Sequence, residues 1–88
     1  MDFNILLEGY KENLLRLSVM LVEKEIIEKE IDFISYPYRR TTIPPEVREK
    51  NILLQNNVYK LDEDIVSLDS TVQKQKLQIK LEIQKSRE

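Results

Sequence analysis

The sequence predicts an all-α protein: an antiparallel two-helix hairpin of coiled-coil type that assembles into a larger helical bundle. Three observations support this prediction. Two long stretches without proline are rich in Leu, Glu, Lys, Gln and Arg, and all three prolines lie in the short segment between them. Each stretch also repeats apolar residues at heptad spacing. We therefore expect one domain over residues 1–88, with helices at about 2–35 and 46–87 and a connector at 36–45.

The composition excludes most kinds of chemistry. The 88 residues include no His, no Cys, no Trp and a single Gly. Metal sites built on imidazole or thiolate, cysteine nucleophiles, disulfides and glycine-rich phosphate loops are thereby excluded. We expect a protein that is not an enzyme, with no catalytic residue, no cofactor, no metal ion and no small-molecule substrate.

The apolar residues are numerous but do not form long runs. Leu, Ile, Val and Phe make up 30 of the 88 residues, which is typical of a chain that folds. The longest apolar runs are as short as Ile5–Leu7 and Val19–Val22, so neither a transmembrane span nor a signal-peptide core is predicted. An intracellular, cytoplasmic location is therefore expected, and a membrane is not expected as a partner.

The prolines define the ends of the two helices. Pro37 moves Tyr36 out of the α region, so the first helix is expected to end near Ser35. Pro44 and Pro45 suit the first turn of the second helix, because the amide protons that they lack would have no helical partner there.

Two segments weaken the helix prediction. Gly9 costs a helix interior about 1 kcal/mol relative to Ala, or else marks the start of a frayed first turn. Residues 76–84 alternate strictly between apolar and polar, which is the pattern of a strand. They are also good helix formers with no turn signal before them, so a continued helix is favoured and a strand stays the alternative.

The second helix carries a clear heptad. Branched residues predominate at a and Leu at d, with a single polar residue in each set. The a positions are Asn51, Val58, Ile65, Val72 and Ile79, and the d positions are Val47, Leu54, Leu61, Leu68 and Gln75. This pattern is typical of parallel pairs, but a parallel pair would set Asp64 against Asp69. An antiparallel hairpin avoids that repulsion.

The first helix carries a second heptad that fits this arrangement. If the connector folds at its centre, near residue 40, residues that lie level across the hairpin have numbers that sum to about 80. A stripe on the first helix then falls on the a and d positions of the second. The expected hairpin seam is Leu15, Val19, Val22, Ile26 and Phe33 against Val47, Leu54, Val58, Leu61 and Ile65.

Polar residues give weaker support to the same register. Lys29 would lie level with Asn51, as a layer that either penalises shifted registers or simply reaches water. Charged residues of opposite sign would also lie level: Arg16 with Asp64, Lys11 with Asp69, Glu30 with Lys50, and Asp32 with Arg48. Lys11 and Arg16 lie roughly 140° apart around the helix, so they cannot both face one partner.

This seam leaves many large apolar residues without a neighbour. Burying them would contribute more than about 20 kcal/mol as a gross upper estimate, so we expect a protein partner, either a second copy or another helical subunit. The alternative is that some of them lie singly at the surface. The expected partner interface comprises Phe3, Leu6, Leu7, Tyr10, Leu14, Leu17, Met20, Leu21, Ile27, Ile31, Ile34, Ile52, Tyr59 and Val66.

The connector holds the most suggestive polar residues. Tyr36, Tyr38, Arg39 and Arg40 combine aromatic surface with positive charge, and such a tip can stack on bases and contact phosphates. The basic C-terminal segment, residues 74–87, points the same way. The tyrosines can equally cap the bundle, however, and the arginines can offset the acidic first helix. A non-enzymatic interaction subunit is therefore the expected function, and a nucleic-acid accessory protein is the alternative.

Overall fold

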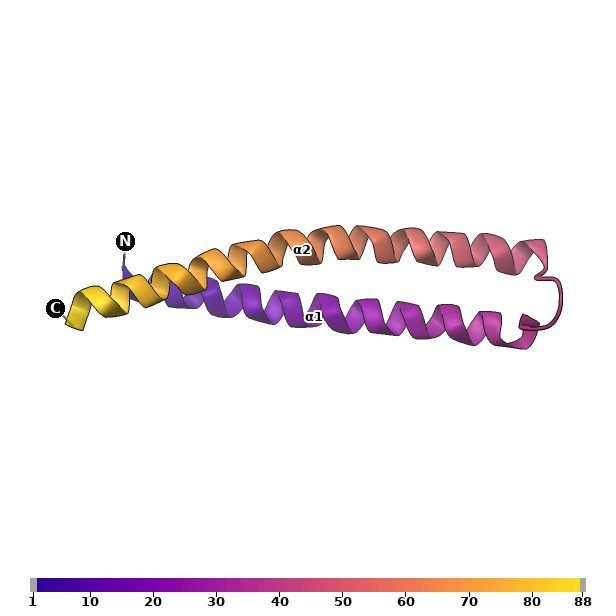
Figure 1. Cartoon of the computed structure of the whole chain (residues 1–88), viewed down its shortest axis with the longest axis horizontal. Coiled ribbons are helices and arrows are strands. Elements are labelled where there is room, and N and C mark those ends of the chain that lie inside the picture. Colours follow the sequence, from indigo (N-terminus) through magenta and orange to yellow (C-terminus); the bar gives the residue numbers. More distant parts are fainter. Residues whose placement is uncertain (1, 88) are drawn as a thin grey trace.

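The computed structural model describes residues 2–87, and these residues form two helices joined by a short connector (Figure 1). Helix α1 spans Phe3–Ser35, a 3-10 helix η1 spans Tyr36–Tyr38, and α2 spans Pro45–Arg87. The predicted all-α fold is confirmed for this part of the chain, where no strand occurs. Residues 76–84 belong to α2. Of the predicted range 1–88, residues 1 and 88 lie outside the described residues.

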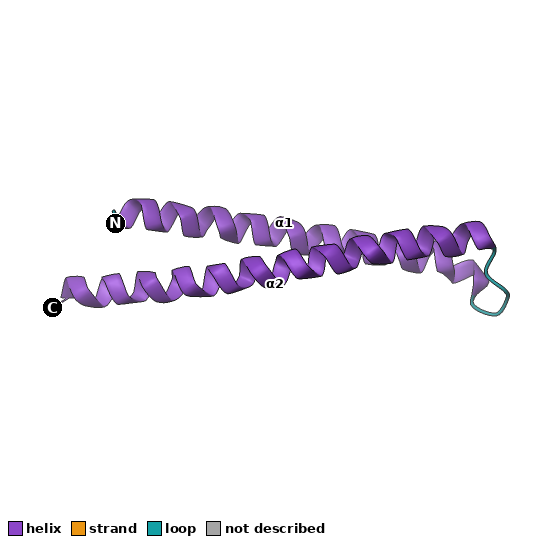
Figure 2. Ribbon diagram, turned by 90° about the horizontal axis from the view of Figure 1, so that it is seen from above, coloured by secondary structure: helices purple, strands orange, loops and turns teal. Residues whose placement is uncertain are grey.

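The two helices run antiparallel and side by side as a rod of 67 × 15 × 14 Å. They appear separated near the connector in Figure 1 but overlap there in the perpendicular view of Figure 2, and the reverse holds at the other end. The helices therefore turn about each other along the rod. With only two helices across its width, the hairpin has little interior.

The helix ends follow local capping rules. The carboxylate of Asp2 caps α1 by accepting a hydrogen bond of 3.1 Å from the amide of Asn4. At the start of α2, the amide of Arg48 donates to the carbonyl of Pro44 at 3.0 Å, and Glu46 places negative charge in the first turn. The predicted boundaries are close to the observed ends. The predicted reason at Pro37 is wrong, however, because Tyr36 keeps αR dihedrals (φ −55°, ψ −46°) and continues as the 3-10 helix η1.

The connector changes the register of the hairpin. Because η1 continues the first arm beyond Ser35, the centre of the reversal moves toward the C-terminus. Most polar contacts between the helices join residues whose numbers sum to 86 or 88, such as Lys24 with Asp62 and Asn13 with Gln75, whereas the longer ion pair of Lys50 with Glu30 sums to 80. For these contacts the predicted sum of about 80 is therefore wrong by about two helical turns of α2.

Polar contacts show the consequences of this shift. Asn51 lies level with Ser35 instead of Lys29, which is exposed and paired with Glu25 at 3.1 Å. Of the four charge pairs expected across the hairpin, only that of Lys50 with Glu30, at 3.8 Å, forms among residues 2–87.

The core of the hairpin is a single row of contacts between α1 and α2. Leu6, Val72 and Ile79 are the buried residues of the described chain, with 3–9% of their surface exposed. On α2, the predicted seam residues are partly buried: Val47, Leu54, Val58, Leu61 and Ile65. On α1, an inner face at heptad spacing packs against them, and its residues are Leu6, Tyr10, Asn13, Leu17, Met20, Lys24, Ile27, Ile31 and Ile34.

The prediction for the α1 side of the seam is therefore wrong. The five predicted residues are exposed: Leu15, Val19, Val22, Ile26 and Phe33. Conversely, several residues assigned to a partner are enclosed by the hairpin itself: Leu6, which is buried, and Leu7, Tyr10, Leu17, Met20, Ile27, Ile31 and Ile34, which are partly buried.

Polar pairing explains why this face of α1 turns inward. The side chain of Asn13 donates a hydrogen bond of 3.0 Å to Gln75, the polar d residue of α2. At the other end, the Nδ2 group of Asn51, the polar a residue, donates to Ser35 at 2.9 Å. In the expected register, Gln75 would lie level with an isoleucine and its amide would lose this partner. The inner face therefore pairs the amide of Gln75 and the Nδ2 group of Asn51, while the buried Oδ1 of Asn51 has no hydrogen-bond partner.

Gly9 lies inside α1, where it is partly buried. A Cβ atom added there would lie 3.5 Å from Nε2 of Gln75, an ordinary van der Waals contact. We therefore expect Gly9→Ala to raise the free energy of unfolding by about 0.5–1 kcal/mol, because the alanine removes the conformational entropy that glycine loses in a helix. Urea denaturation followed by circular dichroism tests this, and a decrease in stability would contradict the packing around Gln75.

Candidate interaction surface

The most prominent surface feature is a row of exposed apolar residues along α1, here called the outer stripe: Leu15, Val19, Val22, Ile26 and Phe33. Their exposed fractions lie between 49% and 79%. Successive members lie four, three, four and seven residues apart, as in the seam of a coiled coil. The outer stripe is roughly 150° around α1 from the inner face, so α2 leaves it uncovered.

Charged residues flank the outer stripe in two exposed rows. On one side lie Lys11, Ser18, Glu25 and Asp32, and on the other side lie Arg16, Glu23 and Glu30. In both rows the basic residue is on the N-terminal side and the acidic residues are on the C-terminal side. The surface beside the outer stripe therefore changes from positive to negative along the helix.

Other apolar residues expected at a partner interface are also exposed. They lie at the first turn of α1, beside the inner face, and on α2: Phe3, Leu14, Leu21, Ile52, Tyr59 and Val66. Further exposed apolar residues were not among the predicted ones: Ile5, Leu53, Leu77, Leu81 and Ile83. For Leu77 and Leu81 a signal was available, because they lie on nearly the opposite side of the helix from Ile79.

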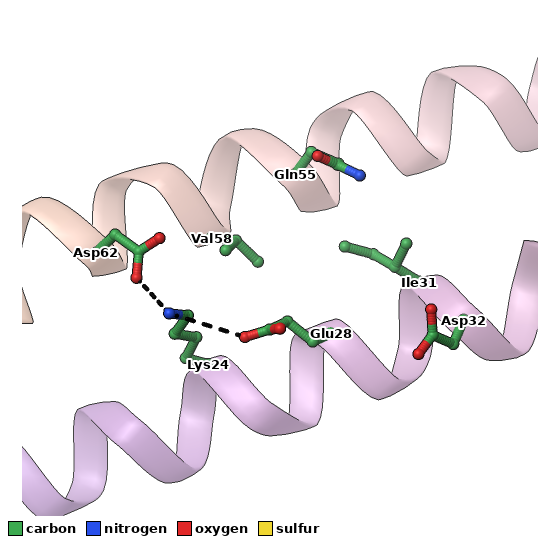
Figure 3. A pocket seen from close by; sticks show the side chains of 7 residues that line it. All are labelled: Lys24, Glu28, Ile31, Asp32, Gln55, Val58 and Asp62. Atoms are coloured by element: carbon green, nitrogen blue, oxygen red, sulfur yellow. Dashed lines mark ion pairs between the residues drawn. The ribbon is translucent and has the colours of Figure 1, made fainter.

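Between the helices, a cleft of about 310 Å³ holds an ion pair that joins α1 to α2 (Figure 3). Lys24 Nζ lies 2.6 Å from Asp62 Oδ1 and 4.0 Å from Glu28 Oε1 on its own helix. The hydrogen bond to the Asp62 carboxylate raises the pKa of Lys24 above its usual 10.5, with a smaller opposing effect of desolvation. The arrangement ties the helices together and offers no nucleophile beside a base.

This ion pair predicts a pH dependence of stability. Because the pKa of Lys24 is higher in the folded chain, the pair contributes its full stabilisation below pH 10.5 and loses it as the pH rises through the folded pKa. Urea midpoints measured from pH 9 to pH 12 should therefore fall less steeply for Asp62→Asn than for the unmodified chain. Equal slopes for the two proteins would contradict a role for the pair.

At the connector, the predicted contact residues come together at one end of the rod. The guanidinium of Arg39 lies 5.1 Å from the centre of the Tyr36 ring, at the distance of a cation–π contact. Tyr36 and Tyr38 also line an open, mostly apolar depression of about 570 Å³ that includes Phe33. Arg40 is exposed. The depression therefore continues the outer stripe to the tip of the hairpin.

The basic C-terminal segment does not join the connector in one surface. It lies at the opposite end of the 67-Å rod (Figure 1). Within it, Lys85 pairs with Glu82 at 3.9 Å. The two basic regions considered for a polyanion thus form two separate patches.

Two further kinds of site, a membrane span and a metal cluster, are absent from residues 2–87. Over residues 2–87, neither helix has a segment both long and apolar enough to cross a bilayer. In the same range, His, Cys, Asp and Glu side chains do not gather in groups of three or more that could hold a metal ion. Comparisons with protein families, curated proteins and solved structures find no match to this chain.

Proposed function

We propose that this protein is a non-enzymatic interaction subunit: a coiled-coil hairpin that docks through its exposed apolar helix faces into a larger helical bundle. Its role would be structural or regulatory, holding or covering a surface of its partner. The hairpin provides a rigid rod, and the partner would supply the second layer of helices that a two-helix chain lacks.

The outer stripe is the observation that carries this proposal. Large apolar residues scattered singly over a surface are normal, but a row of them at heptad spacing is the pattern that a second helix recognises. The row has an apolar centre and charged edges, which is the arrangement of an interface core and its rim.

The alternative, a nucleic-acid accessory protein, has less support. Arg39 is already in contact with Tyr36, and the two basic patches lie at opposite ends of the rod. Salt-dependent binding of an oligonucleotide, lost in Arg39→Ala with Arg40→Ala, would favour this alternative over docking.

The solution mass tests the proposal. Light scattering, combined with circular dichroism at the same protein concentrations, should show a helical chain whose mass exceeds the 10.5 kDa of a monomer. A poorly helical chain that folds only with a helical partner would also support docking. A fully helical, stable monomer at all concentrations would overturn it.

A substitution in the outer stripe separates docking from folding. Val22→Asp should leave the helicity of the hairpin unchanged, because Val22 is not part of the inner face. It should raise the dissociation constant of the assembly at least tenfold, because it places an unpaired charge in the interface. Ser18→Asp, in the flanking row, is the matched control and should have a smaller effect. Equal effects of the two changes would place the interface elsewhere.

A further inference from the structure

We infer that the outer stripe of α1 is a self-association surface, covered by the outer stripe of a second copy that runs antiparallel to it. The inference rests on the proposed docking function and names the partner and its orientation. The partner is another molecule of this chain because the charges beside the outer stripe complement themselves.

The direction follows from the two flanking rows. Lys11 and Arg16 lie at their N-terminal side, and Glu23, Glu30 and Asp32 lie at their C-terminal side. A parallel second copy would bring like charges together, Lys11 against Arg16 and Glu25 against Glu30. An antiparallel copy brings the basic part of each row against the acidic part of the other.

The register follows from the same charges. When the two-fold axis lies between Val19 and Val22, residues that face each other have numbers that sum to 41 in the core. Val19 then packs on Val22 of the second copy, and Leu15 packs on Ile26. The four residues form a continuous apolar core of four layers.

The edges of this core are closed by opposite charges. Equivalent rows meet in an antiparallel pair, so Arg16 faces Glu23 and Lys11 faces Asp32 of the second copy. In the next layer beyond the apolar core, Glu12 faces Lys29. By symmetry each pair occurs twice. A shift of one heptad would instead set Glu23 against Glu23 and Glu25 against Glu25, so the charges select the first register.

The hairpin leaves room for this contact. The outer stripe and its flanking rows are exposed, and the inner face that contacts α2 lies on nearly the opposite side of α1. The second copy can therefore dock without rearranging the contacts between α1 and α2.

Disulfide trapping tests the orientation and register, because the chain has no native cysteine. Leu15→Cys and Ile26→Cys chains, one of them carrying a size tag, are mixed and oxidised. We expect a mixed disulfide between the two variants and little disulfide when either is oxidised alone. Equivalent residues of the two copies would lie about 16 Å apart in the antiparallel pair, too far for an S–S bond.

The outcomes separate this inference from the function on which it rests. A Leu15→Cys disulfide formed with itself indicates a parallel pair and overturns the inference. A chain that assembles by light scattering but forms no mixed disulfide also overturns it, while docking through another face stands. A helical monomer without crosslinks overturns both.

Charge exchange provides a second, independent test. Arg16→Glu should raise the dissociation constant of the dimer about tenfold, because two attractive contacts become repulsive, and Arg16→Glu combined with Glu23→Arg should restore it. Lys60→Glu, an exposed residue of α2, is the control with the same change in net charge. A double variant as weak as Arg16→Glu would show that these residues do not face each other.

Discussion

Ile79→Ala is expected to lower the free energy of unfolding of the hairpin by about 2–4 kcal/mol. Ile79 has only 9% of its surface exposed and lies among the few buried residues of the described chain. Truncation there removes apolar contacts and leaves a cavity, and the better helix propensity of alanine offsets only a few tenths of a kcal/mol. Urea denaturation at a fixed protein concentration measures the loss.

Ile83→Ala is the matched control for this effect. It makes the same chemical change one turn further along α2, at a residue that is 41% exposed. Its effect should stay below about 1 kcal/mol, because the residue already contacts water. Similar losses at the two positions would contradict the contact between the end of α2 and the start of α1.

A cysteine pair that joins Ile27 and Leu61 is expected to form a disulfide within one chain, whereas a pair that joins Val19 and Leu61 is not. Asn13 and Gln75 are in direct contact, and two heptads along each helix in opposite directions lead to Ile27 and Leu61. Val19 lies on the outer stripe of α1 and faces away from α2. A disulfide requires Cβ atoms about 4 Å apart, so only the first pair can close.

This experiment decides which face of α1 packs against α2. Both double variants are oxidised at low protein concentration, where disulfides between chains are rare, and the fast-migrating species is followed by electrophoresis with and without reductant. If the chain with Val19→Cys and Leu61→Cys formed the disulfide instead, the outer stripe of α1 would face α2. The proposed docking surface would then be internal to the hairpin, and the self-association inference would fail with it.

The second helix and the connector could be predicted because their signals are unambiguous. In α2, a single row of apolar residues repeats at heptad spacing, and the other sides are mostly polar. This row is longer than the other apolar row of α2, which holds Ile52, Tyr59 and Val66, so it is the one expected to pack against α1. Pro45 suits the first turn of a helix in any tertiary context, so α2 begins close to its predicted position, and α1 ends near Pro37 although Tyr36 stays in the αR region.

The first helix is different because it carries two rows at heptad spacing on nearly opposite sides. In both rows, five of the six heptad positions between Leu15 and Ile34 are apolar, so hydrophobic periodicity does not distinguish them, and the expected sum of about 80 favours the row through Val19. The structure turns the other row inward, since Asn13 and Lys24 then meet Gln75 and Asp62. Because the two rows hold equal numbers of apolar residues, the pairing of these polar groups is the difference that favours the inner face.

The register was mispredicted for a related reason. A reversal centred on the prolines gives a sum near 80, but η1 lengthens the first arm before the chain turns. The 3-10 hydrogen bond from Arg39 to the carbonyl of Tyr36 depends on local backbone geometry and leaves no periodic trace in the sequence.

The amino-acid sequence by itself determines that this chain forms two long helices, where they end and which face of α2 is apolar, because these properties depend on proline sterics and on one clear heptad. It also determines that more apolar surface exists than two helices can enclose. The tertiary structure alone decides which face of α1 is inside, and therefore which row is left for a partner. The inner face is the one whose polar residues Asn13 and Lys24 pair with Gln75 and Asp62, and such pairings become visible only when both helices are placed in space.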